Sequence, residues 1–212
     1  MKPERKKDII FVAGIGTDVG KTVVSAILCE AFQADYWKPV QAGTEEGGDI
    51  KTIEQLISNK STKIHPSAVV LPYPISPHAS AEKAGIEINS IDLKIPDTEN
   101  NLIIEGAGGL MVPLNYNELF IDWVKLNNLK VVLVSRHYLG SINHTLLSAE
   151  SLKTRNIEVT GIIFNGAENK ATEKVIELNT GFTVLGRIDE LKEVSANSIH
   201  EQAEKFKLNG NF

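Results

Sequence analysis

The sequence predicts an α/β fold in which a mostly parallel sheet carries helices on both faces. Two observations lead to this prediction: short apolar runs of strand length recur along the chain, and patterns with helical spacing lie between them. Strands separated by helices require right-handed crossovers, which bring parallel strands together and cover both faces of the sheet. The chain has 212 residues, of which 42% are hydrophobic. We therefore expect a single domain over residues 1–212 with one large core.

The predicted elements follow one another along the chain in alternation. Four apolar runs predict buried strands, at residues 8–13, 101–105, 130–135 and 159–164, and residues 36–38 and 182–185 are weaker candidates. Apolar residues at helical spacing predict helices from residue 21 to residue 32, near residues 118–126 and over residues 142–154. Between residues 63 and 85, four prolines exclude a long helix and predict a winding segment.

The glycine-rich stretch GIGTDVGKT at residues 14–22 is the strongest functional signal. It fits the phosphate-loop pattern except that Ile15 stands at the leading glycine position, with glycines on either side of it. Glycines let backbone N–H groups point at phosphate oxygens, and the following helix presents its positive end. Lys21 is expected to reach the outer phosphates and Thr22 to ligate Mg²⁺. The alternative is a strand-to-helix turn that binds nothing. The required strand and helix favour nucleotide binding and predict a P-loop NTPase fold.

Three further polar residues are expected at the edge of the sheet where the strands end, because parallel sheets bind ligands there. Lys38 ends a candidate strand, although a solvated surface lysine is the alternative. Glu105 ends an apolar strand before a glycine-rich stretch, so it is a natural Mg²⁺ partner, with a turn glutamate as the alternative. Asn165 can pair its amide with a purine edge, and an asparagine favoured by a turn is an equal alternative.

Composition narrows the class of protein. Twenty-two basic and 27 acidic residues give a net charge of −5, so there is no electrostatic reason to expect nucleic-acid binding. No apolar run approaches the roughly 18 residues of a membrane span, and the first residues lack the long apolar core of a signal peptide. The single cysteine, Cys29, excludes an internal disulfide framework and a cysteine-based zinc cluster. We expect a soluble, cytoplasmic protein that binds neither nucleic acid nor a membrane.

Five motifs in this order and spacing resemble the dethiobiotin synthetase family over residues 10 to about 150. They are GIGTDVGKT, WKPVQAG, SPHAS, EGAGGLMVPL and LGSINHTLL. The resemblance implies a homodimer with a single α/β domain per chain. It also implies a ligase (a cyclo-ligase forming C–N bonds) of biotin biosynthesis that uses ATP and Mg²⁺ to join CO₂ to 7,8-diaminononanoate. The implied products are dethiobiotin, ADP and phosphate, formed through a carbamate and a carbamic-phosphoric anhydride.

The same resemblance implies a role for individual residues. The implied ATP-binding residues are Asp18, Val19, Gly20, Lys21, Thr22, Val23, Glu105, Gly106, Ala107, Gly108 and Asn165. The implied Mg²⁺ ligands are Thr22, Asp49 and Glu105, and the implied catalytic residues are Lys38 and Lys21. The implied substrate-binding residues are Thr17, Lys38, Gly140, Ser141 and Asn143, of which the last three begin a helix that binds the substrate carboxylate across the dimer interface.

Local chemistry offers simpler readings of two of these positions. Asp49 can instead be a helix N-cap. Ser141 can also cap a helix, and the exposed N–H groups of a helix start attract an anion, so capping alone is the alternative to substrate binding at this position.

The chain departs from the family pattern at two positions. Ala42 stands where the family usually has serine or threonine, so a hydroxyl contact to the substrate is missing there, and Thr44 is a candidate replacement. Asp189 stands where the family commonly has proline, in the loop on the adenine side.

Three rival functions remain open at the level of sequence. One is a partitioning or positioning ATPase of the same fold, although this class usually has a lysine where Ile15 stands. Another is the synthetase domain of a glutamine-dependent amidotransferase, for which Cys29 is badly placed as a nucleophile. The third is a binding module that has lost catalysis. ATP consumption that depends on both diamine and bicarbonate would distinguish the synthetase from all three.

Overall fold

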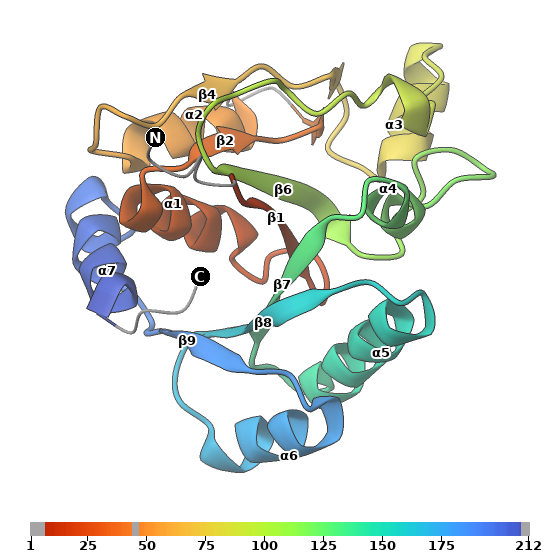
Figure 1. Cartoon of the computed structure of the whole chain (residues 1–212). Coiled ribbons are helices and arrows are strands. Elements are labelled where there is room, and N and C mark those ends of the chain that lie inside the picture. Colours follow the sequence, from red (N-terminus) through yellow and green to blue (C-terminus); the bar gives the residue numbers. More distant parts are fainter. Residues whose placement is uncertain (1–6, 44–46, 209–212) are drawn as a thin grey trace, which may run out of the picture.

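A seven-stranded sheet lies between two layers of helices in the computed structural model, which describes residues 7–43 and 47–208 (Figure 1). The strand order is β4-β2-β6-β1-β7-β8-β9, and every ladder in this sheet is parallel. The strands are β1 (Ile9–Gly14), β2 (Asp35–Trp37), β4 (Ile64–His65), β6 (Leu102–Gly109), β7 (Lys130–Arg136), β8 (Val159–Asn165) and β9 (Val184–Ile188). The predicted α/β fold with a mostly parallel sheet is confirmed.

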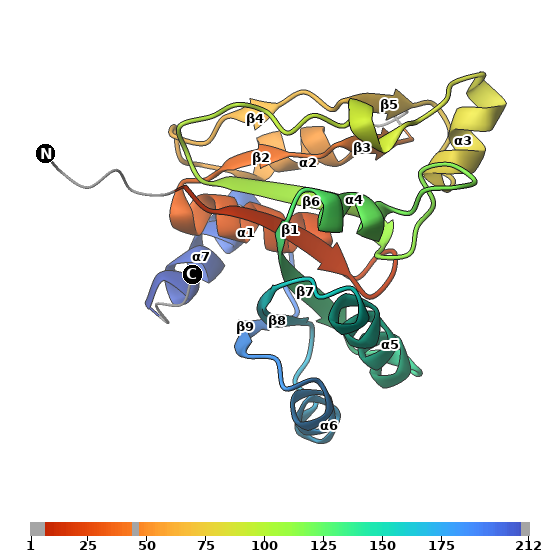
Figure 2. The same ribbon diagram turned by 45° about the vertical axis from the view of Figure 1, so that its right-hand side comes forward.

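Helices cover both faces of the sheet, as Figure 2 shows. The helices α1 (Lys21–Phe32), α2 (Gly48–Leu56) and α7 (Ala196–Leu208) contact one another on one face. On the other face lie α4 (Phe120–Leu126), α5 (Ser141–Thr154) and α6 (Lys170–Thr180). A small second sheet pairs β3 (Val40–Ala42) with β5 (Val69–Leu71), and α3 (Pro77–Ala84) packs against it. A 3₁₀ turn, η1 (Ser90–Asp92), precedes β6.

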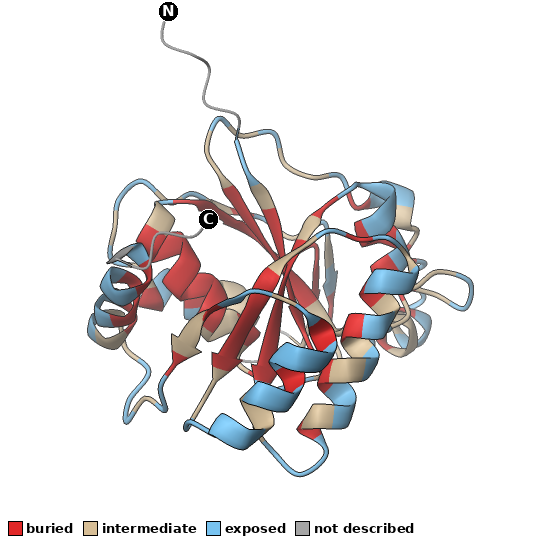
Figure 3. Cartoon of the chain, turned by 60° about the horizontal axis from the view of Figure 1, so that its bottom comes forward, coloured by how far each residue is buried: buried red, intermediate tan, exposed pale blue. Residues whose placement is uncertain are grey.

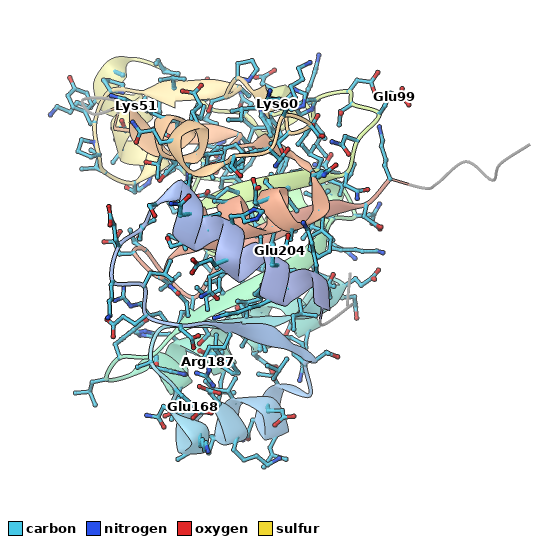
Figure 4. All side chains as sticks on the ribbon, turned by 90° about the vertical axis from the view of Figure 1, so that its left-hand side faces the viewer. Lys51, Lys60, Glu99, Glu168, Arg187 and Glu204 are labelled. Carbon is cyan, nitrogen blue, oxygen red and sulfur yellow. The ribbon has the colours of Figure 1, made fainter. Side chains whose placement is uncertain are left out.

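The core follows from the apolar runs in the sequence. The central strands are buried along their length, whereas the helices expose their outer faces (Figure 3). In β1, Phe11 packs against Phe120 and Trp123 of α4, with ring centroids 5.5 Å and 6.2 Å apart. At the outer strand, Arg187 of β9 pairs with Glu168 at 3.7 Å and so ties the strand to the start of α6 (Figure 4).

Most predicted elements are present, with shifted ends. Helix α1 spans residues 21–32 as predicted, whereas β6 is longer than predicted and includes the glycine-rich stretch up to Gly109. Residues 63–85 contain no long helix, as expected, but they do form β4, β5 and the eight-residue α3. The elements β3, α2, α6 and α7 were not predicted. In the chain that the structure describes, no helix has the length and apolar character that crossing a membrane requires.

Candidate functional site

A cavity of about 980 Å³ opens at the edge of the sheet where the parallel strands end, which we call the carboxyl edge. Its walls come from the phosphate loop, the ends of β2, β6 and β8, and the segment after β9. The predicted site residues that line it are Thr17, Asp18, Gly20, Lys21, Thr22, Val23, Lys38, Asp49, Glu105, Ala107, Gly108 and Asn165. Segments far apart in the sequence therefore meet in one cavity.

The phosphate loop is held in place by contacts within the loop and from β8. Gly20 has φ of 91°, and a Cβ atom there would lie 2.0 Å from Asn165 Nδ2, so only glycine fits. Asn165 Nδ2 donates a hydrogen bond to the Val19 carbonyl at 2.8 Å. Lys21 Nζ donates to the Gly16 carbonyl at 3.0 Å, and burial lowers the pKa of Lys21. The loop thus presents a largely buried ammonium group to the cavity.

Lys38 lies between two carboxylates. Its Nζ is 2.8 Å from Asp49 Oδ2 and 3.0 Å from Glu105 Oε1, and the residue is 4% exposed. Burial alone would lower the pKa of Lys38, but the two carboxylates raise it above its ordinary value. Pairing of Trp37 with Ile104 in adjacent parallel strands brings Lys38 beside Glu105. The alternative of a solvated surface lysine is wrong.

Thr22 joins the same cluster through its hydroxyl group. Its Oγ1 is 3.0 Å from Asp49 Oδ1 and 2.9 Å from Glu105 Oε1. A hydroxyl group has one proton and can donate to only one of these oxygens at a time. Three hard oxygen donors therefore converge within hydrogen-bonding distance, and this is the kind of donor set that Mg²⁺ prefers.

The two carboxylates have no simpler local role. Glu105 belongs to β6 and is 1% exposed, so the alternative of a turn glutamate is wrong. Asp49 lies in the first turn of α2, whose N-cap is Gly47, and its side chain bonds Lys38 and Thr22 instead. The capping alternative for Asp49 is therefore also wrong. Burial would raise the pKa of Asp49, but Lys38 lowers it.

The remaining predicted residues lie outside the lining of this cavity. Val19 is buried and contributes its carbonyl group, and Gly106 lies within β6. The helix-start residues Gly140, Ser141 and Asn143 do not line the cavity either. Gly140 is the N-cap of α5 and no side chain makes a capping bond, so the alternative that Ser141 caps this helix is wrong.

Both departures from the family pattern fall on the cavity wall. Ala42, at the end of β3, and Asp189, directly after β9, both line it. Thr44 lies outside the described residues.

Among the described residues that were not singled out from the sequence, three make side-chain hydrogen bonds to predicted residues that line the cavity. Tyr36 donates a hydrogen bond to Glu105 Oε2 at 2.9 Å, and Gln41 Oε1 accepts one from the Asp49 N–H at 3.1 Å. Arg136 lines the cavity, and its Nη1 is 3.4 Å from the Asp18 carbonyl. The one available signal was the spacing of Tyr36, which is two residues before Lys38 and so shares its face of the strand.

Comparison with known proteins supports an ATP-using site. A sequence model of a family described as "AAA domain" matches residues 8–198. The ATP-dependent dethiobiotin synthetase BioD of Christiangramia forsetii is 52% identical over 197 residues, which cover 93% of this chain and 95% of that protein. The protein of the same name from Cytophaga hutchinsonii is 48% identical and covers 92% of this chain and 95% of its own length.

Solved structures at low identity share the fold. The septum site-determining protein MinD of Pyrococcus horikoshii, complexed with Mg-ADP, has a TM-score of 0.58 at 15% identity and covers 97% of this chain and 98% of its own. A ParA family ATPase from Chlorobium tepidum has a TM-score of 0.57 at 14% identity, with 93% and 98% covered. The close relatives, rather than these distant ones, identify the group, and the chain belongs to the family of ATP-dependent dethiobiotin synthetases.

Proposed function

We propose that this chain closes the ureido ring of dethiobiotin from 7,8-diaminononanoate and CO₂, with conversion of ATP to ADP and phosphate. The protein is a ligase of biotin biosynthesis. The observation that carries the proposal is the convergence of Lys21, Lys38, Thr22 and two carboxylates in one cavity beside the phosphate loop.

The chemistry needs charge stabilisation more than proton transfer. CO₂ reacts with an unprotonated amine to give a carbamate, whose oxygen is a poor leaving group. Transfer of the terminal phosphate of ATP gives a carbamic-phosphoric anhydride, which the second amine attacks with loss of phosphate. Phosphoryl transfer depends on positioning and on neutralising negative charge. The buried ammonium groups of Lys21 and Lys38 suit this role, because a low dielectric strengthens their field.

The nucleotide would lie along the phosphate loop toward the end of β8. Residues 18–23 would hold its phosphates, and residues 105–108 would line the cavity beside them. Asn165 is the candidate to contact the base, and its bond to the Val19 carbonyl would couple the base end to the loop. Thr22, Asp49 and Glu105 would hold Mg²⁺, which when bound offsets phosphate charge.

Substrate binding is proposed to need a second copy of the chain. Thr17 and Lys38 line the cavity, whereas Gly140, Ser141 and Asn143 do not, so they would serve the cavity of a partner. Leu139 just before α5 and Leu147 on it are exposed large apolar side chains, and a partner would cover them. Sedimentation of the purified chain should give twice the mass of 23.2 kDa, and a monomer at working concentration would contradict the dimer.

The cellular setting is also a proposal. An ATP-consuming reaction and a single cysteine fit the cytoplasm, where thiols stay reduced. No partner beyond the small molecules and the second copy is invoked.

The decisive experiment incubates purified protein with diamine, bicarbonate, ATP and magnesium and detects the ring-closed product by mass spectrometry. We expect dethiobiotin and ADP in equal amounts, and no product when any one component is omitted. Slow ATP hydrolysis that ignores the diamine would instead favour a nucleotide-switched scaffold. A requirement for glutamine would favour an amidotransferase domain, and nucleotide binding without turnover would favour a binding module.

A further inference from the structure

Glu105 uses its two carboxylate oxygens for different partners. Oε1 faces Lys38 Nζ at 3.0 Å and Thr22 Oγ1 at 2.9 Å, the groups that line the cavity. Oε2 points away from them and accepts a hydrogen bond from Tyr36 Oη at 2.9 Å. Tyr36 is fully buried and Glu105 nearly so, which means that solvent cannot replace the phenol. The Tyr36 hydroxyl is therefore the partner that constrains the inner oxygen of this carboxylate, while Lys38 and Thr22 contact the outer one.

Strand β2 and the residue that follows it supply two of the three contacts to this carboxylate. Residues two apart on a strand share a face, so Tyr36 and the residue that follows β2, Lys38, project to the same side. The register pairs Tyr36 with Ile103 and Trp37 with Ile104, which leaves Glu105 beside Lys38. The phenol therefore reaches Glu105 from deeper in the core, and the ammonium group reaches it from the cavity.

We propose that Tyr36 is a positioning residue that fixes the Glu105 carboxylate so that Oε1 faces the cavity as a cation ligand. This inference rests on the proposed role of Glu105 in holding Mg²⁺. Partners that orient a metal ligand are worth about 10- to 100-fold in metal affinity or activity. The competing explanation is that the phenol merely satisfies a buried carboxylate oxygen and affects stability alone.

The test separates these explanations by measuring binding rather than turnover. The affinity for the non-hydrolysable nucleotide AMP-PNP is measured by calorimetry with excess Mg²⁺ and again in EDTA. The ratio of the two affinities reports how much the metal contributes. For Tyr36→Phe we expect unchanged affinity in EDTA, which shows an intact phosphate loop, and a ratio reduced about 10-fold or more.

Thr98→Val is the matched control. The Thr98 hydroxyl donates a hydrogen bond to Asp35 Oδ2 at 2.7 Å, and Asp35 lies at the opposite end of β2. Like Tyr36→Phe, this variant therefore removes a hydroxyl donor that bonds a buried carboxylate. It should lower the melting temperature and leave the Mg²⁺ ratio unchanged. If Tyr36→Phe behaves in the same way, the positioning role is wrong.

Two further measurements keep the inference testable. If Tyr36 acts through Glu105, the Tyr36→Phe change should alter the ratio far less when Glu105→Gln is already present. Should Tyr36→Phe fail to fold, 4-aminophenylalanine at position 36 keeps a hydrogen-bond donor, so this variant should retain the wild-type ratio of the two affinities. A reduced ratio in this variant would overturn the inference. A wild-type protein whose affinity ignores Mg²⁺ would instead contradict the proposed metal site.

Discussion

The two ends of the sheet each bury a carboxylate, and the partners differ. At the carboxyl edge, Glu105 contacts Lys38, Thr22 and Tyr36 beside the cavity. At the amino edge, Asp35 accepts hydrogen bonds from the Thr98 hydroxyl, the Lys63 N–H and the Asn100 amide, and its Oδ2 lies 2.9 Å from His65 Nε2. Neither Asp35 nor any of these partners lines the large cavity.

We interpret the difference as one between a carboxylate with a structural role, Asp35, and a carboxylate with a proposed functional role, Glu105. The partners of Asp35 fix the loops that enter β4 and β6, so removing any of them should affect folding. Burial would raise the pKa of Asp35, but the hydrogen bonds lower it, with Thr98 the strongest contributor. The partners of Glu105 include an ammonium group on a long side chain that faces a space large enough for a nucleotide. Variants at the two ends should therefore differ in whether turnover or stability suffers.

The largest effect on turnover is expected from Lys38→Ala. This change removes a buried positive charge from the proposed site of phosphoryl transfer, so kcat should fall by about 10²-fold or more. It also leaves Glu105 and Asp49 without their shared cation, which should lower the free energy of unfolding by ~3 kcal/mol. Steady-state kinetics and chemical denaturation without Mg²⁺ measure the two effects.

An exposed lysine at the amino edge provides the control for this variant. Lys130 pairs with Asp8 at 3.5 Å and Glu158 at 3.9 Å, and its side chain is 43% exposed. Lys130→Ala should leave kcat unchanged and cost less than about 1 kcal/mol. Turnover of Lys38→Ala within twofold of wild type would remove Lys38 from the mechanism.

The sequence predicted best the elements whose pattern lies within a short stretch of the chain. The run from β1 to the end of α1 is encoded by an apolar strand, a glycine loop and helical spacing within residues 9–32, and it appears as predicted. The helix α6 has only Ile176 and Thr180 buried, so it lacks a strong apolar stripe and was missed. The strands β3 and β5 have three residues each, too few for a visible alternation.

The site was predictable where a motif, the end of an expected strand or the family resemblance named a residue. The contact of Tyr36 with Glu105 depends on β2 pairing with β6 across 69 residues of sequence, and no local pattern reports such a pairing. Lys38 was predicted from its place at a strand end and by resemblance, but its place between two carboxylates follows from the same strand register. The pairing of strands that are distant in sequence therefore determines which polar residues contact one another at the site.

A second structural carboxylate, Glu30 near the end of α1, predicts a stability effect with a defined pH dependence. Burial alone would raise the pKa of Glu30, but hydrogen bonds from Ser58 and Asn59 hold it at about 2. A depressed pKa adds stability above the unfolded value near 4.5 and loses it as pH falls toward 2. We expect Glu30→Gln to lower the free energy of unfolding at pH 7 by up to about 3 kcal/mol.

Measuring the free energy of unfolding over a series of pH values checks this prediction. The difference in free energy of unfolding between wild type and Glu30→Gln should shrink steadily below pH 4.5, and kcat at pH 7 should be unchanged. Glu201→Gln, at an exposed position on α7, should cost less than about 0.5 kcal/mol. A constant difference from pH 7 to pH 3 would show that the charge of Glu30 is not what stabilises the fold.

Thr98→Val should have a smaller effect than Lys38→Ala or Glu30→Gln, and it tests the amino edge most directly. Asp35 keeps three other partners after this change, but the Thr98 hydroxyl also accepts a hydrogen bond from the Asn100 N–H at 3.1 Å. The loss should therefore be that of one hydrogen bond to a charged group and one to a backbone N–H, about 2 kcal/mol in total. Thermal denaturation measures it, and kcat and KM should stay at wild-type values because no part of this cluster lines the cavity. A changed KM for ATP would mean that the two ends of β2 are coupled, and the separation between structural and functional carboxylates would then fail.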